Sequence, residues 1–155
     1  MLRLWRVSNP DYLLASMLRS GSGGDTRPMS VQPHGAVLRM VIVDDNAHFL
    51  EAARTVLEDD GIDVVGVART SAEALRLAAA LRPDVILVDV DLGGESGLDL
   101  AQQLAAAENP RIVLISAYPE SDLADLIAVS PAVGFVPKSQ LSARAVVGLL
   151  GDEGF

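Results

Sequence analysis

The sequence predicts an open α/β domain in which a parallel sheet carries helices on both faces. Short runs of Val, Ile and Leu alternate five times with segments of helical periodicity between residues 37 and 150. Strands this apolar must be covered on both faces, and the helices of a doubly wound parallel sheet provide that cover. Five such units are too few to close an eight-stranded barrel, so we expect the sheet to stay open.

The first two units are the clearest. Residues 38–43 form an apolar run followed by acids, and residues 46–59 place apolar side chains at helical spacing, namely Phe49, Leu50, Ala53, Val56 and Leu57. Residues 62–68 are apolar and β-branched, which favours a second strand. The next helix opens at Ser71 and must end before Pro83, because the residue before a proline is disfavoured in a helix.

The last three units repeat this alternation. We expect strands at 84–89, 111–116 and 133–136, and helices at 97–106, 120–129 and 142–150. Pro131 follows the fourth helix closely and cannot continue it. Either Ser139 or Ser142 would cap the last helix.

Composition and charge exclude several classes of function. Half of the 155 residues are apolar, 21% are charged and none is Cys, which indicates a globular protein without disulfides, thiolate nucleophiles or Cys-based metal sites. The formal net charge of −9 repels phosphate backbones, so direct nucleic acid binding is disfavoured. No segment has the length of a membrane span or the pattern of a signal peptide, and we therefore expect a cytoplasmic protein.

The charge divides the chain into two parts. Residues 1–36 carry four Arg and two Asp, whereas residues 37–155 carry eight basic and 19 acidic side chains. Residues 20–35 are rich in Gly, Ser and Pro and lack periodicity. We expect 1–36 to be a flexible, disordered N-terminal extension and 37–151 to be the folded domain. An amphipathic anchor near Leu14, or a translation start at Met29 or Met40, are alternatives for the extension.

Polar side chains gather where the predicted strands end. The first strand ends in Asp44 and Asp45, the third in Asp89 and the fourth in Ser116, and Lys138 closely follows the fifth. In doubly wound sheets, ligands bind beyond the carboxyl ends of the strands. Carboxylates that meet there repel one another, and a hard divalent cation such as Mg²⁺ relieves the repulsion by taking oxygen ligands. Lys138 is the only Lys of the chain, beside eleven Arg.

These motifs together resemble the receiver domain of two-component response regulators. The matching segments are Val41-Ile42-Val43-Asp44-Asp45, Asp84 to Asp89, Ile115-Ser116-Ala117 and Gly134-Phe135-Val136-Pro137-Lys138. The resemblance covers about 37–150, or three-quarters of the chain. It implies a flavodoxin-like (βα)5 doubly wound sheet of strand order 2-1-3-4-5, and a cytoplasmic signalling switch rather than an enzyme that turns over an external substrate.

The resemblance also implies a role for each site residue. Asp89 would accept a phosphoryl group from a sensor histidine kinase or phosphotransfer protein, and Lys138 would contact the acyl phosphate as a movable point charge. Mg²⁺ would be held by Asp44, Asp45, Asp89 and the backbone carbonyl of Asp91. Ser116 would hydrogen-bond the phosphoryl group, and Phe135 would turn inward as the switch aromatic. The surface of the fourth helix, fifth strand and fifth helix would then change for a downstream protein target.

The loop after Asp89 departs from the family pattern. Gly93 stands where many members have Pro, so we expect a more mobile loop. Asp91 adds a carboxylate two positions after the phosphoacceptor, and we expect it to alter the lifetime of the acyl phosphate. Tyr118 is expected at the same rim, where it would limit the access of water.

Other interpretations of the chain stay open at this point. A haloacid-dehalogenase-like phosphohydrolase would use Asp89 and Asp91 as nucleophile and acid/base, but there the acidic metal pair comes late in the chain. A receiver-like module that is never phosphorylated is a third option. Because the chain stops five residues after Leu150, we expect a stand-alone receiver, or else a truncated transcription regulator without its helix-turn-helix domain. Phosphorylation could drive formation of a homodimer.

Overall fold

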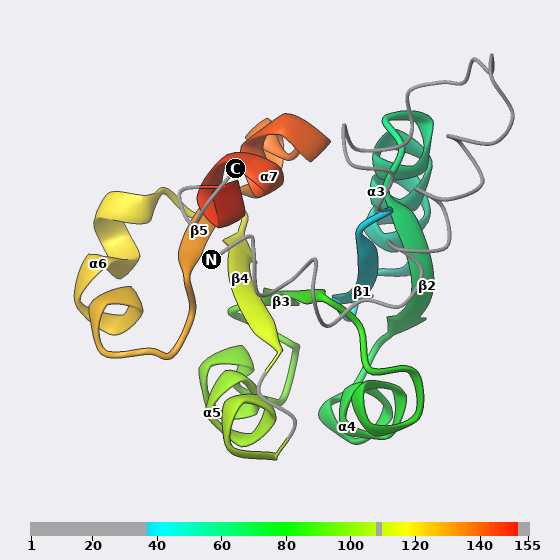
Figure 1. The fold of residues 1–155 in the computed structure, drawn as a ribbon. Coiled ribbons are helices and arrows are strands. Elements are labelled where there is room, and N and C mark those ends of the chain that lie inside the picture. Colours follow the sequence, from blue (N-terminus) through cyan, green and yellow to red (C-terminus); the bar gives the residue numbers. More distant parts are fainter. Residues whose placement is uncertain (1–36, 108–109, 152–155) are drawn as a thin grey trace, which may run out of the picture.

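The fold is a five-stranded parallel sheet flanked by helices, seen in a computed structural model that describes residues 37–107 and 110–151 (Figure 1). The expected extension of residues 1–36 lies outside the described residues. The strands are β1 (Arg39–Val43), β2 (Asp63–Ala68), β3 (Val85–Asp89), β4 (Arg111–Ser116) and β5 (Gly134–Pro137). Their order is β2-β1-β3-β4-β5, which confirms the flavodoxin-like topology predicted from the sequence.

Five α-helices alternate with the strands in the described residues. They are α3 (Ala47–Asp59), α4 (Ser71–Leu81), α5 (Gly97–Ala107), α6 (Glu120–Ala128) and α7 (Ala143–Gly151). The predicted boundaries differ from these by at most one residue, as is usual at frayed ends. Of the two candidate caps of α7, the structure selects Ser142, whose Oγ accepts a hydrogen bond from the backbone N–H of Ala145 at 3.0 Å. A short 3-10 turn, η1 (Lys138–Gln140), was not predicted.

Different helices cover the two faces of the sheet (Figure 1), and each face carries its own apolar layer. Alternate strand residues point to opposite faces, so Met40 and Ile42 pack with α3 and α7, whereas Val41 and Val43 pack with α4 and α5. Helix α6 contributes only partly buried side chains, Leu123 and Ile127, to the second layer. The strand order reverses between β1 and β3, and this reversal places the carboxyl ends of both strands at one crevice.

Gly97 lets helix α5 begin directly against the end of β3. A Cβ atom at this position would lie 1.8 Å from the carbonyl oxygen of Asp89 and 2.8 Å from its carbonyl carbon. Both are backbone atoms and cannot move aside without displacing the strand. The close approach fixes the start of α5 behind Asp89, and only glycine permits it.

We expect Gly97→Ala to lower the free energy of unfolding by about 1–3 kcal/mol, because the added methyl group overpacks the backbone. Gly148→Ala in α7 is the matched control, since a Cβ atom there would enter open space, with no contact within 4 Å. That change should be neutral or stabilising by up to about 1 kcal/mol. Urea unfolding of the two variants measures the difference, and equal effects would contradict the close approach at Gly97.

None of the helices in the described ranges is long and apolar enough to cross a membrane.

Candidate functional site

The acidic cluster forms where β1 and β3 end. Asp44 and Asp45 directly follow β1, and Asp89 is the last residue of β3. One carboxylate oxygen from each residue lies within 4.8 Å of the others. Asp44 is fully buried, Asp89 is 4% exposed and Asp45 is exposed. The predicted grouping of these three carboxylates is therefore present in the fold.

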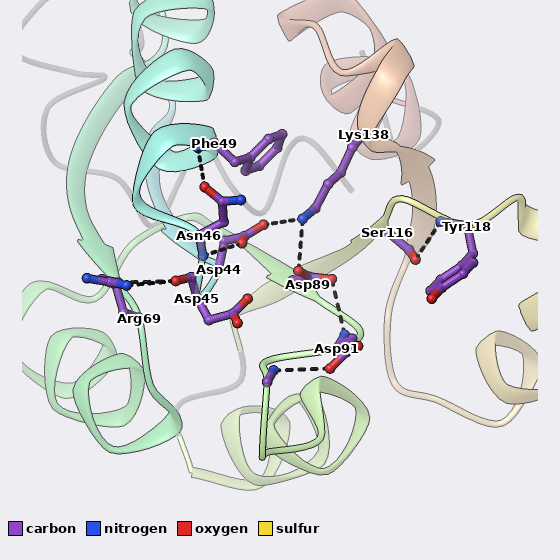
Figure 2. Close-up of polar contacts among 11 residues, drawn as sticks. Asp44, Asp45, Asn46, Phe49, Arg69, Asp89, Asp91, Ser116, Tyr118 and Lys138 are labelled. Atoms are coloured by element: carbon purple, nitrogen blue, oxygen red, sulfur yellow. Dashed lines mark hydrogen bonds and ion pairs between the residues drawn. The ribbon is translucent and has the colours of Figure 1, made fainter.

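Lys138 reaches this cluster from the start of η1 (Figure 2). Its Nζ lies 2.6 Å from Asp44 Oδ2 and 2.9 Å from Asp89 Oδ2. The pairing with two carboxylates at once makes Lys138 a bridge between the ends of β1 and β3. One ammonium group balances only one of these charges, so the buried pair keeps an excess of negative charge.

Burial is the main reason why the pKa of Asp89 lies above its ordinary value. Loss of hydration raises the pKa of Asp89 to about 6, with a smaller contribution in the same direction from the charge of Asp44. Hydrogen bonds from Lys138 and from the backbone N–H of Asp91 oppose the shift. For Lys138, burial lowers the pKa, but the hydrogen bonds and charges of Asp44 and Asp89 outweigh it and raise the pKa above its ordinary value. Lys138 is thus a cation at neutral pH.

The donor set suits a hard divalent cation such as Mg²⁺. Three carboxylates face one another with a single ammonium as countercharge, and the buried Asp44 Oδ2 has the Lys138 ammonium beside it at 2.6 Å. Oxygen donors with an excess of negative charge are the ligands that Mg²⁺ prefers. The fit rests on these side chains; the expected contribution of the Asp91 carbonyl stays a prediction.

A pocket of about 280 Å³ opens beside the cluster. Its lining includes Asp45, Asp89, Ser116, Tyr118 and Lys138. Asp91 also lines this pocket. Of the five residues that the sequence placed at the carboxyl ends of the strands, four thus line this pocket. The fifth, Asp44, is buried and pairs with Lys138. Tyr118 is 59% exposed at the rim, as expected.

The loop between β3 and α5 is held by its own hydrogen bonds (Figure 2). The backbone N–H of Asp91 donates to Asp89 Oδ1 at 3.1 Å, and Asp91 Oδ1 accepts from the backbone N–H of Gly93 at 3.0 Å. Glu95 accepts a hydrogen bond from the backbone N–H of Ser71 at 2.8 Å, which ties the loop to α4. Gly93 has a φ of +78°, which Pro cannot adopt. The glycine therefore permits a left-handed turn here, and the greater mobility of the loop stays a prediction.

The predicted switch residues are both buried. Ser116 is 1% exposed, and its Oγ accepts a hydrogen bond from the backbone N–H of Tyr118 at 3.0 Å. Phe135 is 8% exposed and packs in the layer of α4 and α5. Phe135 thus already lies inward, the position that we expected only after phosphorylation. The predicted inward turn would have to start from a different conformation.

Three residues at the site were not assigned a role there from the sequence. Asn46 caps α3, because its Oδ1 accepts from the backbone N–H of Phe49 at 3.0 Å. The Phe49 ring lies 4.5 Å, centroid to Nζ, from Lys138. Arg69 donates to the backbone oxygen of Asp45 from Nε at 3.2 Å and from Nη2 at 2.9 Å. Asn46 could have been found from the preference for Asn at helix N-caps, whereas Arg69 left no signal in the sequence.

Comparison with known proteins agrees with this geometry. The family model for the response regulator receiver domain matches residues 40–147. The chain belongs to this family. It is therefore a receiver domain of two-component signalling, a class that interacts with histidine kinases and downstream effectors and is generally not enzymatic.

Individual relatives cover the same region. A protein-glutamate methylesterase/protein-glutamine glutaminase from Myxococcus xanthus is 39% identical over 119 residues, which are 75% of this chain and 34% of the relative. The receiver domain thus aligns with about a third of that curated relative.

Two solved structures show the same fold. The signal receiver domain of a modulated diguanylate cyclase from Desulfovibrio desulfuricans is 30% identical with a TM-score of 0.66, covering 76% of this receiver domain protein and 93% of the other chain. A two-component response regulator of the LuxR family from Aurantimonas is 27% identical with a TM-score of 0.65, covering 75% and 87%.

Proposed function

We propose that the receiver domain is a phosphorylation-dependent switch in which Asp89 accepts a phosphoryl group from a phosphohistidine. The donor would be a sensor histidine kinase or a phosphotransfer protein, and the reaction would depend on Mg²⁺. The observation that carries this proposal is the pairing of Asp89 Oδ2 with Lys138 Nζ at 2.9 Å beside an open pocket lined by both residues. A buried nucleophile with an adjacent cation can react with an anionic donor.

The transfer step balances without another reactant. An oxygen of the Asp89 carboxylate forms the new P–O bond, and the P–N bond to the donor imidazole breaks. The electron pair of the broken bond stays on the imidazole, which leaves in its neutral form after taking up a proton from water. With a pKa of about 6, Asp89 is mostly ionised at neutral pH and needs no separate base.

Positioning and charge carry this kind of catalysis. Lys138 would leave its contact with Asp89 Oδ2 for an oxygen of the arriving phosphoryl group, and Asp44 would keep the ammonium within reach. Asp44, Asp45, Asp89 and the carbonyl of Asp91 would hold Mg²⁺, which when bound neutralises negative charge on the phosphoryl oxygens. Ser116 would donate its hydroxyl to another of these oxygens.

The output would be a change in the surface formed by α6, β5 and α7. A groove of about 670 Å³ lies there, and Phe135, Tyr118 and Leu149 are among its lining residues. Phe135 therefore separates the groove from the apolar layer of α4 and α5, where its side chain packs. A movement of Ser116 towards the phosphoryl group would alter this packing and with it the fit of a downstream protein target or a second copy.

Beryllofluoride with Mg²⁺ tests the proposal, because it mimics a phosphoryl group on a carboxylate. We expect amide resonances of the acidic cluster and of α6, β5 and α7 to shift in the native protein and not in Asp89→Ala. The same shifts in both proteins, or none in the native protein, would overturn the switch. Steady turnover of a phosphomonoester would instead favour a phosphohydrolase.

Asp91→Asn is expected to slow hydrolysis of the acyl phosphate by about fivefold, because it removes a charge that repels the phosphoryl group, worth about 1 kcal/mol at a surface site. Asn keeps an oxygen that can accept the hydrogen bond from the Gly93 N–H, so the loop should be retained. Loss of the phosphoryl group is followed over time by intact mass. An unchanged rate would show that the Asp91 charge does not affect the acyl phosphate.

A further inference from the structure

Phe49 and Lys138 are connected in two ways, by a direct contact between the ring and the ammonium and by hydrogen bonds through Asn46 and Asp44 (Figure 2). Asp44 Oδ1 accepts from the backbone N–H of Asn46 at 2.8 Å, and Asn46 Oδ1 accepts from the backbone N–H of Phe49 at 3.0 Å. The ring lies 4.5 Å from Lys138 Nζ, and Nζ returns to Asp44 Oδ2 at 2.6 Å. The first turn of α3 and the lysine are thus linked through the Asp44 carboxylate.

We propose that Phe49 is a positioning residue, which holds the Lys138 ammonium over Asp89 by a cation–π contact. This inference rests on the proposed function, since it concerns how fast Asp89 takes up a phosphoryl group. Phe49 itself does not touch the reacting atoms. Its effect would act through the lysine alone.

The surroundings of the ammonium make this contact significant. Lys138 has a side chain only 19% exposed, and cation–π contacts strengthen as the cation loses water. Asp44 and Asp89 hold the ammonium by Oδ2 atoms, while the face of the Phe49 ring bounds it from α3. A flexible four-carbon stem is thereby confined to a small region next to the nucleophile.

The ring is itself held in place. Phe49 is partly buried and packs against the apolar layer beneath α3 and α7. Its backbone is fixed by the Asn46 cap at the start of the helix. These contacts restrict the position of the ring. The ammonium could then move from the Asp89 carboxylate to a phosphoryl oxygen while it stays against the face of the ring.

Core packing is the competing explanation for an apolar side chain at this position, and two variants separate the explanations. Phe49→Leu keeps an apolar side chain but removes the aromatic face, whereas Phe49→Tyr keeps the face. If Phe49 positions Lys138, phosphorylation by acetyl phosphate and Mg²⁺ should slow by about fivefold in the Leu variant and stay within about twofold in the Tyr variant, as expected for a cation–π contact worth about 1 kcal/mol at 1.36 kcal/mol per tenfold.

Lys138 offers a direct readout because it is the only Lys of the chain. Lysine labelled with ¹³C gives a single set of side-chain resonances, and a ring facing the ammonium shifts the ε-methylene protons upfield. We expect this shift in the native protein and in Phe49→Tyr, and its loss in Phe49→Leu. Urea unfolding of the same proteins reports any general loss of packing.

Where the native protein takes up a phosphoryl group, the inference requires both the slower reaction and the altered lysine resonance in Phe49→Leu. A change in only one of them, or the same changes in Phe49→Tyr, would overturn it. The proposed function fails separately, when the native protein takes up no phosphoryl group at all. The lysine resonance then still decides whether the ring positions Lys138.

Discussion

Lys138→Ala is expected to lower the free energy of unfolding by about 3–5 kcal/mol at neutral pH in the absence of Mg²⁺, the range seen when one partner of a buried ion pair is removed. Asp44 and Asp89 would then face each other in a buried site without the ammonium that now lies 2.6 and 2.9 Å from them. The two carboxylates would repel each other without a countercharge. The loss should shrink as the pH falls below about 6, where Asp89 takes up a proton.

Denaturant unfolding measures this effect, and two variants serve as controls. Arg54→Ala removes the cation of an exposed pair with Glu58, at 3.4 Å with side chains 45% and 44% exposed, and should cost less than about 1 kcal/mol. Lys138→Arg keeps a positive charge and should recover part of the stability. A Lys138→Ala protein as stable as the Arg54→Ala protein would contradict the buried pairing.

In contrast to Lys138→Ala, Asp89→Asn is expected to raise the free energy of unfolding at neutral pH without Mg²⁺. The folded-state pKa of Asp89 is about 6, above its ordinary value of 3.8. Stability linked to this group is therefore complete below about pH 4 and is lost as the pH rises through about 6. Asn has a similar shape and does not ionise, so it should gain on the order of 2 kcal/mol at about pH 7.

Unfolding curves at about pH 4 and about pH 7 test this expectation, because the gain should vanish at the lower pH. Mg²⁺ should stabilise the native protein more than Asp89→Asn, since the variant lacks one of the three clustered carboxylates. An Asn variant that is less stable than the native protein at both pH values would contradict the raised pKa of Asp89. The chain would then hold this carboxylate without cost to the fold.

Most of the fold and the acidic site could be predicted, because they depend on patterns of neighbouring residues that can be recognised in the sequence. Alternation of apolar runs with helical spacing marks all five strands and helices, and parallel strands necessarily bring Asp44, Asp45 and Asp89 to one edge. The strand order came from the resemblance to receiver domains, and the structure confirms it. Some ends of the elements lie one residue from their predicted positions, because caps and not periodicity decide them.

The contacts that could not be predicted depend on distances across the fold. Phe49 fits the helical spacing of a core residue, and nothing in the sequence indicates that Lys138, 89 positions later, lies against its ring. Arg69 reaches the Asp45 backbone from the end of β2 for the same reason. The inward position of Phe135 depends on how tightly its neighbours pack, which a pattern of residue types does not specify.

Incubation with acetyl phosphate and Mg²⁺, followed by intact mass of the native protein and of Asp89→Asn, tests the central claim most directly. We expect the native protein to gain one phosphoryl group. It should gain none when a chelator has removed Mg²⁺ before the incubation. Asp89→Asn should gain none, although it keeps Asp44, Asp45 and Lys138. A native protein that gains no phosphoryl group, or an Asp89→Asn protein that gains one as the native protein does, would contradict Asp89 as the phosphoacceptor.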